Sequence, residues 1–86
     1  MDKNELISIV KKKLITNIKI ENINVEDKSF LHKNHSGNQL GKYHLKITIS
    51  SNELKIMDKI DSNKKIYKIL DEEMKNFIHS LQILIN

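Results

Sequence analysis

The sequence predicts a small single-domain α+β sandwich, in which helices cover one face of a three-stranded mixed sheet. Two stretches with different periodicities carry this prediction. Residues 3–15 repeat apolar side chains at helical spacing, as an amphipathic helix does. Residues 43–50 alternate strictly between apolar and polar, as a half-buried strand does. The chain has 86 residues, so we expect residues 1–86 to form one domain.

The first half of the chain is expected to form a helix, two strands and the loop between them. Asp2 and Glu5 have the spacing of a capping box, with the aspartate as N-cap of the first helix. Apolar residues alternate over part of the next stretch, which places a strand at 20–27. Residues 30–42 are polar and contain both glycines, which indicates a loop. So short a connection favours an antiparallel pair of strands.

The second half is expected to form two helices and a closing strand. Ser50 and Glu53 have the spacing of a second capping box, ahead of a short helix. Asn63 is a good N-cap for a long helix over 64–77, where apolar residues recur at helical spacing. Residues 78–85 then form a strand that returns parallel to a neighbour by a right-handed crossover. The predicted order is therefore αββααβ, and the second sheet face is expected to stay open to solvent.

Composition argues against several classes of function. The chain contains no cysteine, so it can form neither a disulfide framework nor a thiolate metal site of its own. No apolar run approaches the roughly 18 residues that span a bilayer. The charged segment Met1–Glu5 is followed by no apolar h-region, so we expect a cytoplasmic protein without a signal peptide. No motif pairs a nucleophile with a base or two carboxylates, so we do not expect an enzyme.

Positive charge and imidazole concentrate in one window of the chain. Fifteen lysines and eleven acids leave a net charge of +4, and arginine is absent. Residues 29–50 contain three lysines and no acid, together with His32, His35 and His44. Two interpretations account for the lysines and histidines of this window: a solvated loop beside a strand, or a loop that binds an anion, a metal or a partner. Both interpretations stay open at this point.

Several short motifs, in order and spacing, resemble those of the BolA-like proteins, whose fold is similar to the KH-type nucleic-acid-binding domain. Residues 25–29, Val-Glu-Asp-Lys-Ser, resemble the end of the family's first strand. His35 and His44 have the nine-residue spacing of two family histidines. Residues 78–81 match the family's Ile-His-Ala-Leu at three of four positions. The resemblance covers most of the chain and implies a KH-like fold.

This resemblance implies an adaptor that binds a monothiol glutaredoxin around a bridging [2Fe–2S] cluster, in iron–sulfur trafficking and iron homeostasis. Such a cluster takes four ligands, usually thiolates, with imidazole replacing some of them. Because this chain has no thiol, it can contribute only nitrogen, while glutaredoxin and glutathione supply sulfur. His35 is the candidate metal ligand, and His32 could substitute for it. No cofactor is expected on the chain alone, which we expect to be a monomer that binds no membrane.

The family's second histidine falls on Asn63, within the family's Arg-His-Arg motif. A carboxamide oxygen is a poor ligand for such a cluster. Ligation by one histidine, ligation by a surrogate histidine and docking without a cluster therefore all stay open. The expected contact surface joins the 30–42 loop to the start of the long helix. His44 is expected to be structural or part of the open sheet face rather than a first ligand, and His79 is expected to make an internal hydrogen bond.

Bacterial members of the family are also described as transcription regulators, so nucleic-acid binding is the alternative function. Three lysines are expected in the first two turns of the long helix, where they and the helix N-terminus would attract phosphate or an acidic partner. Lysine drift in an AT-rich gene explains them equally well. Without arginine, sequence-specific readout is the weaker form of this hypothesis. The candidate partner or nucleic-acid surface consists of Ser62, Asn63, Lys64, Lys65 and Lys68.

Overall fold

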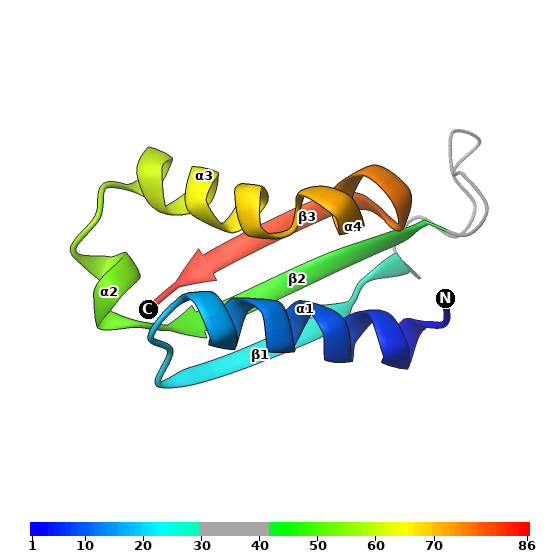
Figure 1. Ribbon diagram of the computed structural model, residues 1–86, viewed down its shortest axis with the longest axis horizontal. Helices are drawn as coiled ribbons and strands as arrows, with labels where there is room; N and C mark the ends of the chain where they lie inside the picture. The colour runs from blue at the N-terminus through cyan, green and yellow to red at the C-terminus, as the bar shows by residue number, and fades with distance from the viewer. Residues whose placement is uncertain (30–41) are drawn as a thin grey trace.

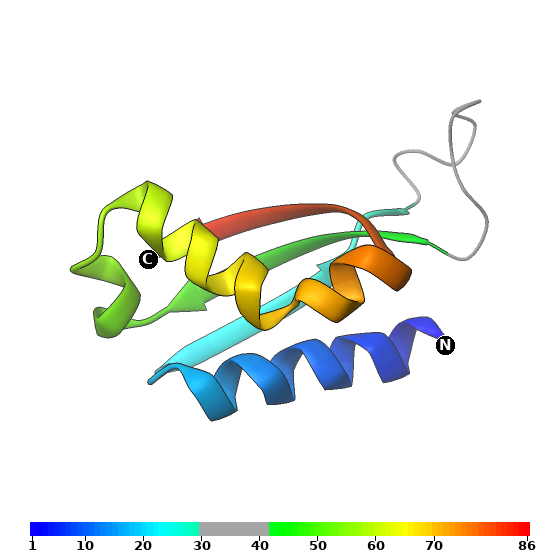
Figure 2. The same ribbon diagram turned by 45° about the horizontal axis from the view of Figure 1, so that its top comes forward.

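The computed structural model describes residues 1–29 and 42–86, in which helices α1, α3 and α4 lie on one face of a three-stranded sheet (Figures 1 and 2). The elements are α1 (Lys3–Asn17), β1 (Asn22–Asp27), β2 (Tyr43–Ser50), α2 (Asn52–Lys55), α3 (Lys59–Ile69), α4 (Asp71–Asn76) and β3 (Ile78–Ile85). The predicted α+β sandwich is confirmed. No helix of the described ranges has the length and hydropathy of a membrane span.

The sheet has the order β1-β2-β3, with β2 at its centre. β1 pairs with β2 antiparallel, and β3 pairs with β2 parallel, as predicted. Tyr43 lies opposite Ile78 at one end of the sheet, and Ile49 lies opposite Ile85 at the other. We call these the Tyr43 end and the Ile49 end. About 20 Å of strand separates them, because each residue step advances the chain by about 3.3 Å.

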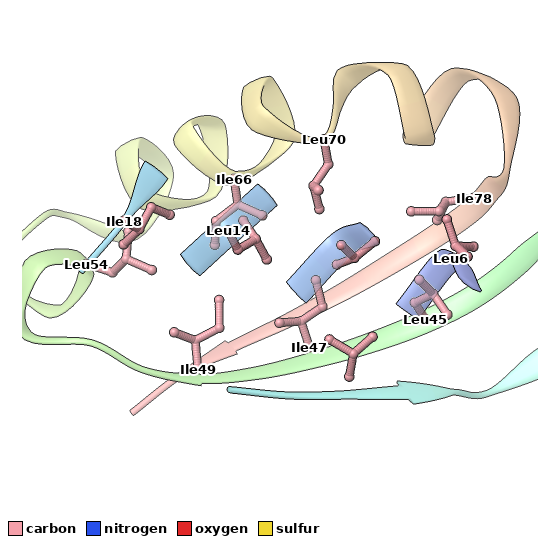
Figure 3. Close-up of a cluster of buried hydrophobic side chains, with 12 residues drawn as sticks. Leu6, Leu14, Ile18, Leu45, Ile47, Ile49, Leu54, Ile66, Leu70 and Ile78 are labelled. Carbon is pink, nitrogen blue, oxygen red and sulfur yellow. The ribbon is translucent and has the colours of Figure 1, made fainter. Parts of the chain in front are cut away.

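The core fills the space between the sheet and the three helices (Figure 3). Side chains spaced four residues apart on α1 form one buried stripe, and alternate residues of β2 face it. Each fully buried leucine or isoleucine contributes about 1.5–3 kcal/mol relative to an exposed one. Burial on this single face of the sheet therefore dominates the stability of the domain. The buried apolar residues are Leu6, Val10, Leu14, Ile18, Val25, Leu45, Ile47, Ile49, Leu54, Ile66, Leu70 and Ile78.

The helix caps correct two of the expected boundaries. Asp2 accepts the N–H of Glu5 at 2.8 Å, so the first predicted cap is confirmed. Ser51 caps α2, and its hydroxyl accepts the N–H of Leu54. The expected cap at Ser50 is wrong, because Ser50 is still paired in β2. Asp58 caps α3, which therefore begins at Lys59, and the expected N-cap at Asn63 is wrong.

The long helix expected over 64–77 is divided into α3 and α4. The backbone departs from helical geometry at Leu70, with φ −97° and ψ 19°. Few hydrogen bonds are lost there, because the N–H of Leu70 donates to Ile66 at 3.0 Å and its C=O accepts from Met74 at 2.8 Å. The break adds one helix to the predicted order. Beyond it, Glu73 on α4 faces α1 and is buried.

An ion pair joins α1 to α4 at the border of the core. Lys13 Nζ donates to Glu73 Oε2 at 2.6 Å, while Glu73 Oε1 is buried with no hydrogen bond from the described residues. The Glu73 side chain is 5% exposed and that of Lys13 is 35% exposed. The hydrogen bond to Glu73 raises the pKa of Lys13 above its usual 10.5, against the opposing effect of partial burial. The pair therefore holds α4 against α1 at the cost of desolvating a carboxylate.

Removing the cation alone should destabilise the fold. We expect Lys13→Met to lower the free energy of unfolding by about 2 kcal/mol, because the buried Glu73 carboxylate loses its partner while the partial exposure of Lys13 limits the loss. Urea unfolding measures the change. The double variant Lys13→Met/Glu73→Met leaves no buried charge and should recover most of the stability. A double variant no more stable than Lys13→Met would contradict this account.

The same ion pair should make stability depend on alkaline pH. The folded pKa of Lys13 lies above 10.5, so between neutral pH and pH 10.5 the contribution of the pair is complete, and it is lost as the pH rises through the folded pKa. The difference in unfolding free energy between the unmodified chain and Lys13→Met should therefore be constant from neutral pH to pH 10.5 and shrink above it. Urea titrations on both sides of that value test the sign. A difference that grows with alkaline pH would show that the pair is assigned wrongly.

Candidate functional site

A polar network closes the Tyr43 end of the β1–β2 pair. Asp27 Oδ1 accepts the N–H of Ser29 at 2.9 Å and also accepts its hydroxyl. The Ser29 hydroxyl oxygen in turn accepts the N–H of His44 at 3.1 Å. The N–H of Lys28 donates to the C=O of His44 at 2.7 Å. The chain therefore leaves and re-enters the described part of the structure at the same end of the sheet, and the residues that resemble the family's strand motif build this closure.

Two histidines from neighbouring strands meet at this end. His44 is buried on the side of β2 opposite Leu45, and its Nδ1 lies 2.6 Å from the hydroxyl oxygen of Ser80. His79 is exposed, and its ring contacts the ring of His44 edge to face, with centroids 4.9 Å apart. Within the described residues this ring contact replaces the internal hydrogen bond expected for His79, so that expectation is wrong. His79 presents an imidazole to solvent.

An irregularity in β3 explains why His79 stands out from the strand. Tyr43 lies opposite Ile78 and His44 lies opposite Ser80, so His79 is an extra residue on β3. An extra residue of this kind re-aims a side chain and is common next to functional sites. The sequence carried a signal for it, because the apolar spacing is three residues from Ile78 to Leu81 and two residues thereafter.

The two histidines proposed as ligands from the sequence, His32 and His35, lie outside the described residues. The segment that contains them begins and ends at the Tyr43 end of the sheet. In residues 1–29 and 42–86, no group of three or more His, Cys, Asp or Glu side chains could hold a metal ion. The described residues therefore offer this end one exposed imidazole, His79, supported by His44.

The start of α3 lies at the opposite end of the sheet. Ser62 and Asn63 line a cavity of about 290 Å³ together with the last residues of β3, residues 83–85. About 20 Å of strand separates this Ile49 end from His79. The described residues that flank the 30–41 segment, Ser29 and Lys42, therefore lie at the other end of the sheet from Ser62 and Asn63, and the segment itself lies outside the described residues.

Two members of the expected partner surface have structural roles. Ser62 is 1% exposed, and its hydroxyl donates to the C=O of Lys59 at 3.0 Å. Lys65 Nζ donates to Glu53 at 2.8 Å, and this bond, with a second from the N–H of Lys19, lowers the pKa of the Glu53 carboxyl. Ser62 therefore packs against the core, and the charge of Lys65 is matched by a carboxylate.

Lys64 and Lys68 are exposed on the outer side of α3, one turn apart. Because the helix begins at Lys59, neither lies in the first turn, and Lys68 lies in the last turn. The expected contribution of a helix N-terminus to these lysines is therefore wrong. A cation in the last turn is favoured by the helix dipole, which is an ordinary structural role.

The fold and the Tyr43 end define a small α+β domain with an open sheet face and paired histidines where β2 and β3 begin. The sequence profile of the BolA-like protein family matches residues 14–86, and the chain therefore belongs to the BolA-like protein family. It is 32% identical over 59 residues to the DNA-binding transcriptional regulator BolA of Haemophilus influenzae. That match covers 69% of this chain and 54% of the relative, so it spans about half of the relative's length.

Solved structures share the same fold at low sequence identity. The BolA domain of SufE1 from Arabidopsis thaliana has a TM-score of 0.79 and 22% identity, with 100% of this chain and 93% of that chain covered. BolA1 from Arabidopsis thaliana has a TM-score of 0.77 and 22% identity, with coverage of 93% and 88%. BolA1 from Mus musculus has a TM-score of 0.74 and 18% identity, with coverage of 92% and 62%. These likenesses show the fold.

Proposed function

We propose that this chain is an adaptor that docks a monothiol glutaredoxin and modulates a [2Fe–2S] cluster held between the two proteins, in iron–sulfur trafficking and iron homeostasis. The observation that carries the proposal is the exposed imidazole of His79, at the end of the sheet where the segment with His32 and His35 begins and ends. The cluster is cargo shared between two proteins. Its handling is binding chemistry, and the chain needs no catalytic group for it.

The donor set supports shared ligation. A [2Fe–2S] cluster takes four ligands, usually thiolates, with imidazole replacing some of them. The chain has no cysteine, and the described residues contain no group of three metal-binding side chains. A glutaredoxin and glutathione therefore supply the sulfur in this proposal, and the chain supplies one or two nitrogens.

His79 is a better proposed nitrogen donor than Asn63. The carboxamide of Asn63 is a weak ligand for iron in such a cluster, and it lies at the Ile49 end. The ring of His79 is exposed and is steadied by the ring of His44, which Ser80 holds through Nδ1. His35 stays the proposed ligand from the 30–41 segment, with His32 as its substitute.

Reconstitution tests this proposal. We expect the chain, a monothiol glutaredoxin, glutathione, iron(II) and sulfide, mixed without oxygen, to give a heterodimer with a new visible circular dichroism spectrum. His79→Ala and His35→Ala should each change that spectrum, because losing a nitrogen ligand alters the iron coordination. Gln82→Ala, an exposed change on the same strand, should not. Native mass spectrometry counts the iron and the partner in each complex.

The outcomes separate the parts of the proposal. Absence of both the complex and the new spectrum rules out the adaptor function. A complex whose spectrum is unchanged by alanine at His79, His35 and His32 rules out ligation by these nitrogens, and only docking without ligation remains. A spectrum altered by His32→Ala and unaffected by His35→Ala reverses the order of the two candidates.

The Haemophilus influenzae relative is a DNA-binding transcriptional regulator, which favours nucleic-acid binding as a second candidate function of this chain. Lys64 and Lys68 are the exposed lysines of the proposed surface, and at this spacing both can reach one phosphate backbone. Asp61 and Asp71 are also exposed at neighbouring positions, which weakens the local positive field. Because arginine is absent, the proposal is phosphate-directed binding without strong base readout.

A salt series tests the second function. We expect Lys64→Gln/Lys68→Gln to weaken binding to duplex DNA and to reduce the slope of log K against log salt concentration by about 2, because each lysine that neutralises a phosphate contributes about 1. The matched variant Lys3→Gln/Lys12→Gln, on α1, has the same net charge and should leave the slope unchanged. Filter retention measures both. Binding that does not fall with salt, or an equal loss in both variants, would count against a phosphate-directed patch on α3.

A further inference from the structure

The cavity at the Ile49 end is apolar with a positive margin. Its volume is about 290 Å³, and its apolar lining is Leu54, Met57 and residues 83–85. Lys55 and Lys59 also line it, and they are the charged side chains among the described residues that do so. Figure 1 shows α2 and the beginning of α3 beside the end of β3, and residues of these elements line the cavity. The volume is at the lower limit of cavities that enclose small molecules, about 300 Å³.

The free edge of β3 borders the cavity. In a parallel pair, alternate residues turn their N–H and C=O toward the neighbouring strand. The N–H of Asn86 donates to Ile49 at 2.8 Å, so the even-numbered residues at this end of β3 face β2. Ile83 and Ile85 therefore turn their backbone groups outward, and no hydrogen bond from the described residues reaches those groups. The hydroxyl of Tyr67 donates to the C=O of Leu81 at 3.2 Å, so the C=O of this odd-numbered residue also points away from β2. Tyr67 therefore covers the edge of β3 just before Ile83.

Exposed apolar side chains extend the surface beyond the cavity. Ile60 precedes Asn63 by three residues and Tyr67 by seven, so all three lie on one side of α3. Asn63 lines the cavity and Tyr67 reaches β3, which places Ile60 on the side that faces the free edge. Ile60 is 68% exposed on this side, while Leu84, which also lines the cavity, is 43% exposed and turns its side chain to the sheet face opposite the helices, because Ile83 and Ile85 face the core. Apolar residues gathered around a cavity mark an interaction surface larger than the cavity itself.

The charges select an acidic partner. Lys55 and Lys59 form no ion pair with the described residues, and Lys64, one turn after Ile60, forms none either. Asp58, whose carboxylate accepts the N–H of Asp61 at 2.8 Å, and Asp61 are exposed in the same stretch, so residues 55–64 carry three lysines and two acids, but neither acid lines the cavity. A second copy of the chain would bring the same lysines against each other, and each copy carries a net charge of +4. A hetero-partner with carboxylates fits this surface better.

We infer that the Ile49 end is a docking site for an extended, acidic segment of a partner protein. The segment adds a fourth strand along the free edge at Ile83 and Ile85, places an apolar side chain in the cavity and pairs its carboxylates with Lys55 and Lys59. Backbone hydrogen bonds supply affinity, and the cavity and the lysines supply specificity. This site lies about 20 Å from His79 along the sheet, so it does not depend on the proposed glutaredoxin contact.

A designed peptide tests the inference. The probe is a fluorescein-labelled ten-residue peptide in which valine or leucine alternates with aspartate or glutamate. We expect saturable binding by fluorescence anisotropy, with NMR shifts at residues 83–86 and slower amide exchange at Ile83 and Ile85. A version with lysine for every acid, and a version with a central proline that breaks strand pairing, should each bind about tenfold more weakly or worse.

Variants of the chain test the positive margin. Lys55→Glu/Lys59→Glu should weaken the acidic peptide by about tenfold or more, and the matched variant Lys3→Glu/Lys12→Glu, with the same net charge, should not. The glutaredoxin complex should form equally with both variants, which separates a failure here from a failure of the proposed function. Absence of saturable binding, equal binding of the lysine or proline peptide, equal loss in both variants, or binding of decanoate at these residues without binding of the peptide would each overturn the inference.

Discussion

The apolar face of the central strand β2 is the constraint on which the rest of the structure depends. Leu45, Ile47 and Ile49 are at most 2% exposed, and a strand turns alternate side chains to opposite faces. The same chain segment must therefore present Lys46 and Thr48 on its other side. Because only one face is apolar, α1, α3 and α4 all lie on that face (Figure 2). The antiparallel β1–β2 pair and the parallel return of β3 then place the candidate functional groups at the two ends of the sheet.

The irregular start of β3 is a consequence of the same core. Ile78 is buried, and Leu81 also packs against the core, although residues three apart on a regular strand face opposite ways. One extra residue on β3 reconciles the two positions, and that residue is His79. Ser80 is thereby brought opposite His44, where its hydroxyl holds the buried imidazole. Packing of the apolar residues therefore creates the contrast between a buried histidine and an exposed one.

Strong periodicity and local caps made much of the fold predictable. The alternating stretch 43–50 has the same bounds as β2, and α1 begins after the Asp2 cap as expected. Both features depend on residues that are neighbours in sequence. The start of α3 was not predictable in this way, since Asp58 and Asn63 are both good caps. Tertiary packing decides between them, because Ser62 lies against the core one turn before Ile66 and requires the helix to include it.

The candidate site was less predictable than the fold, because it depends on where strands end in space. The sequence placed imidazoles in one window and lysines in another, and the resemblance joined them into one surface. The strand register instead separates residues 62–63, beside the end of β3, from His44 and Lys42, where β2 begins and the 30–41 segment ends. His79 belongs to the motif at residues 78–81, and the sequence alone favours a structural role for it, because the two-residue period of a strand gives no reason for an extra residue. The pairing across to β2 supplies that reason.

The distance between the two ends of the sheet bears on the proposed adaptor function. Both ends belong to one sheet, and β2 runs between them with hydrogen-bonded strands on either side. Sites that share no residues and lie more than about 10 Å apart usually contribute independent free energies. Binding of a partner at the Ile49 end should therefore leave the affinity for a partner at His79 nearly unchanged. The two partners would influence each other because they are held close together, and not through a conformational change of the domain. Two partners held on one small domain meet at a high effective concentration, up to the millimolar range for short flexible connections. The proposed adaptor function needs no further coupling, because ligand exchange between neighbouring partners depends on how often their donor atoms meet.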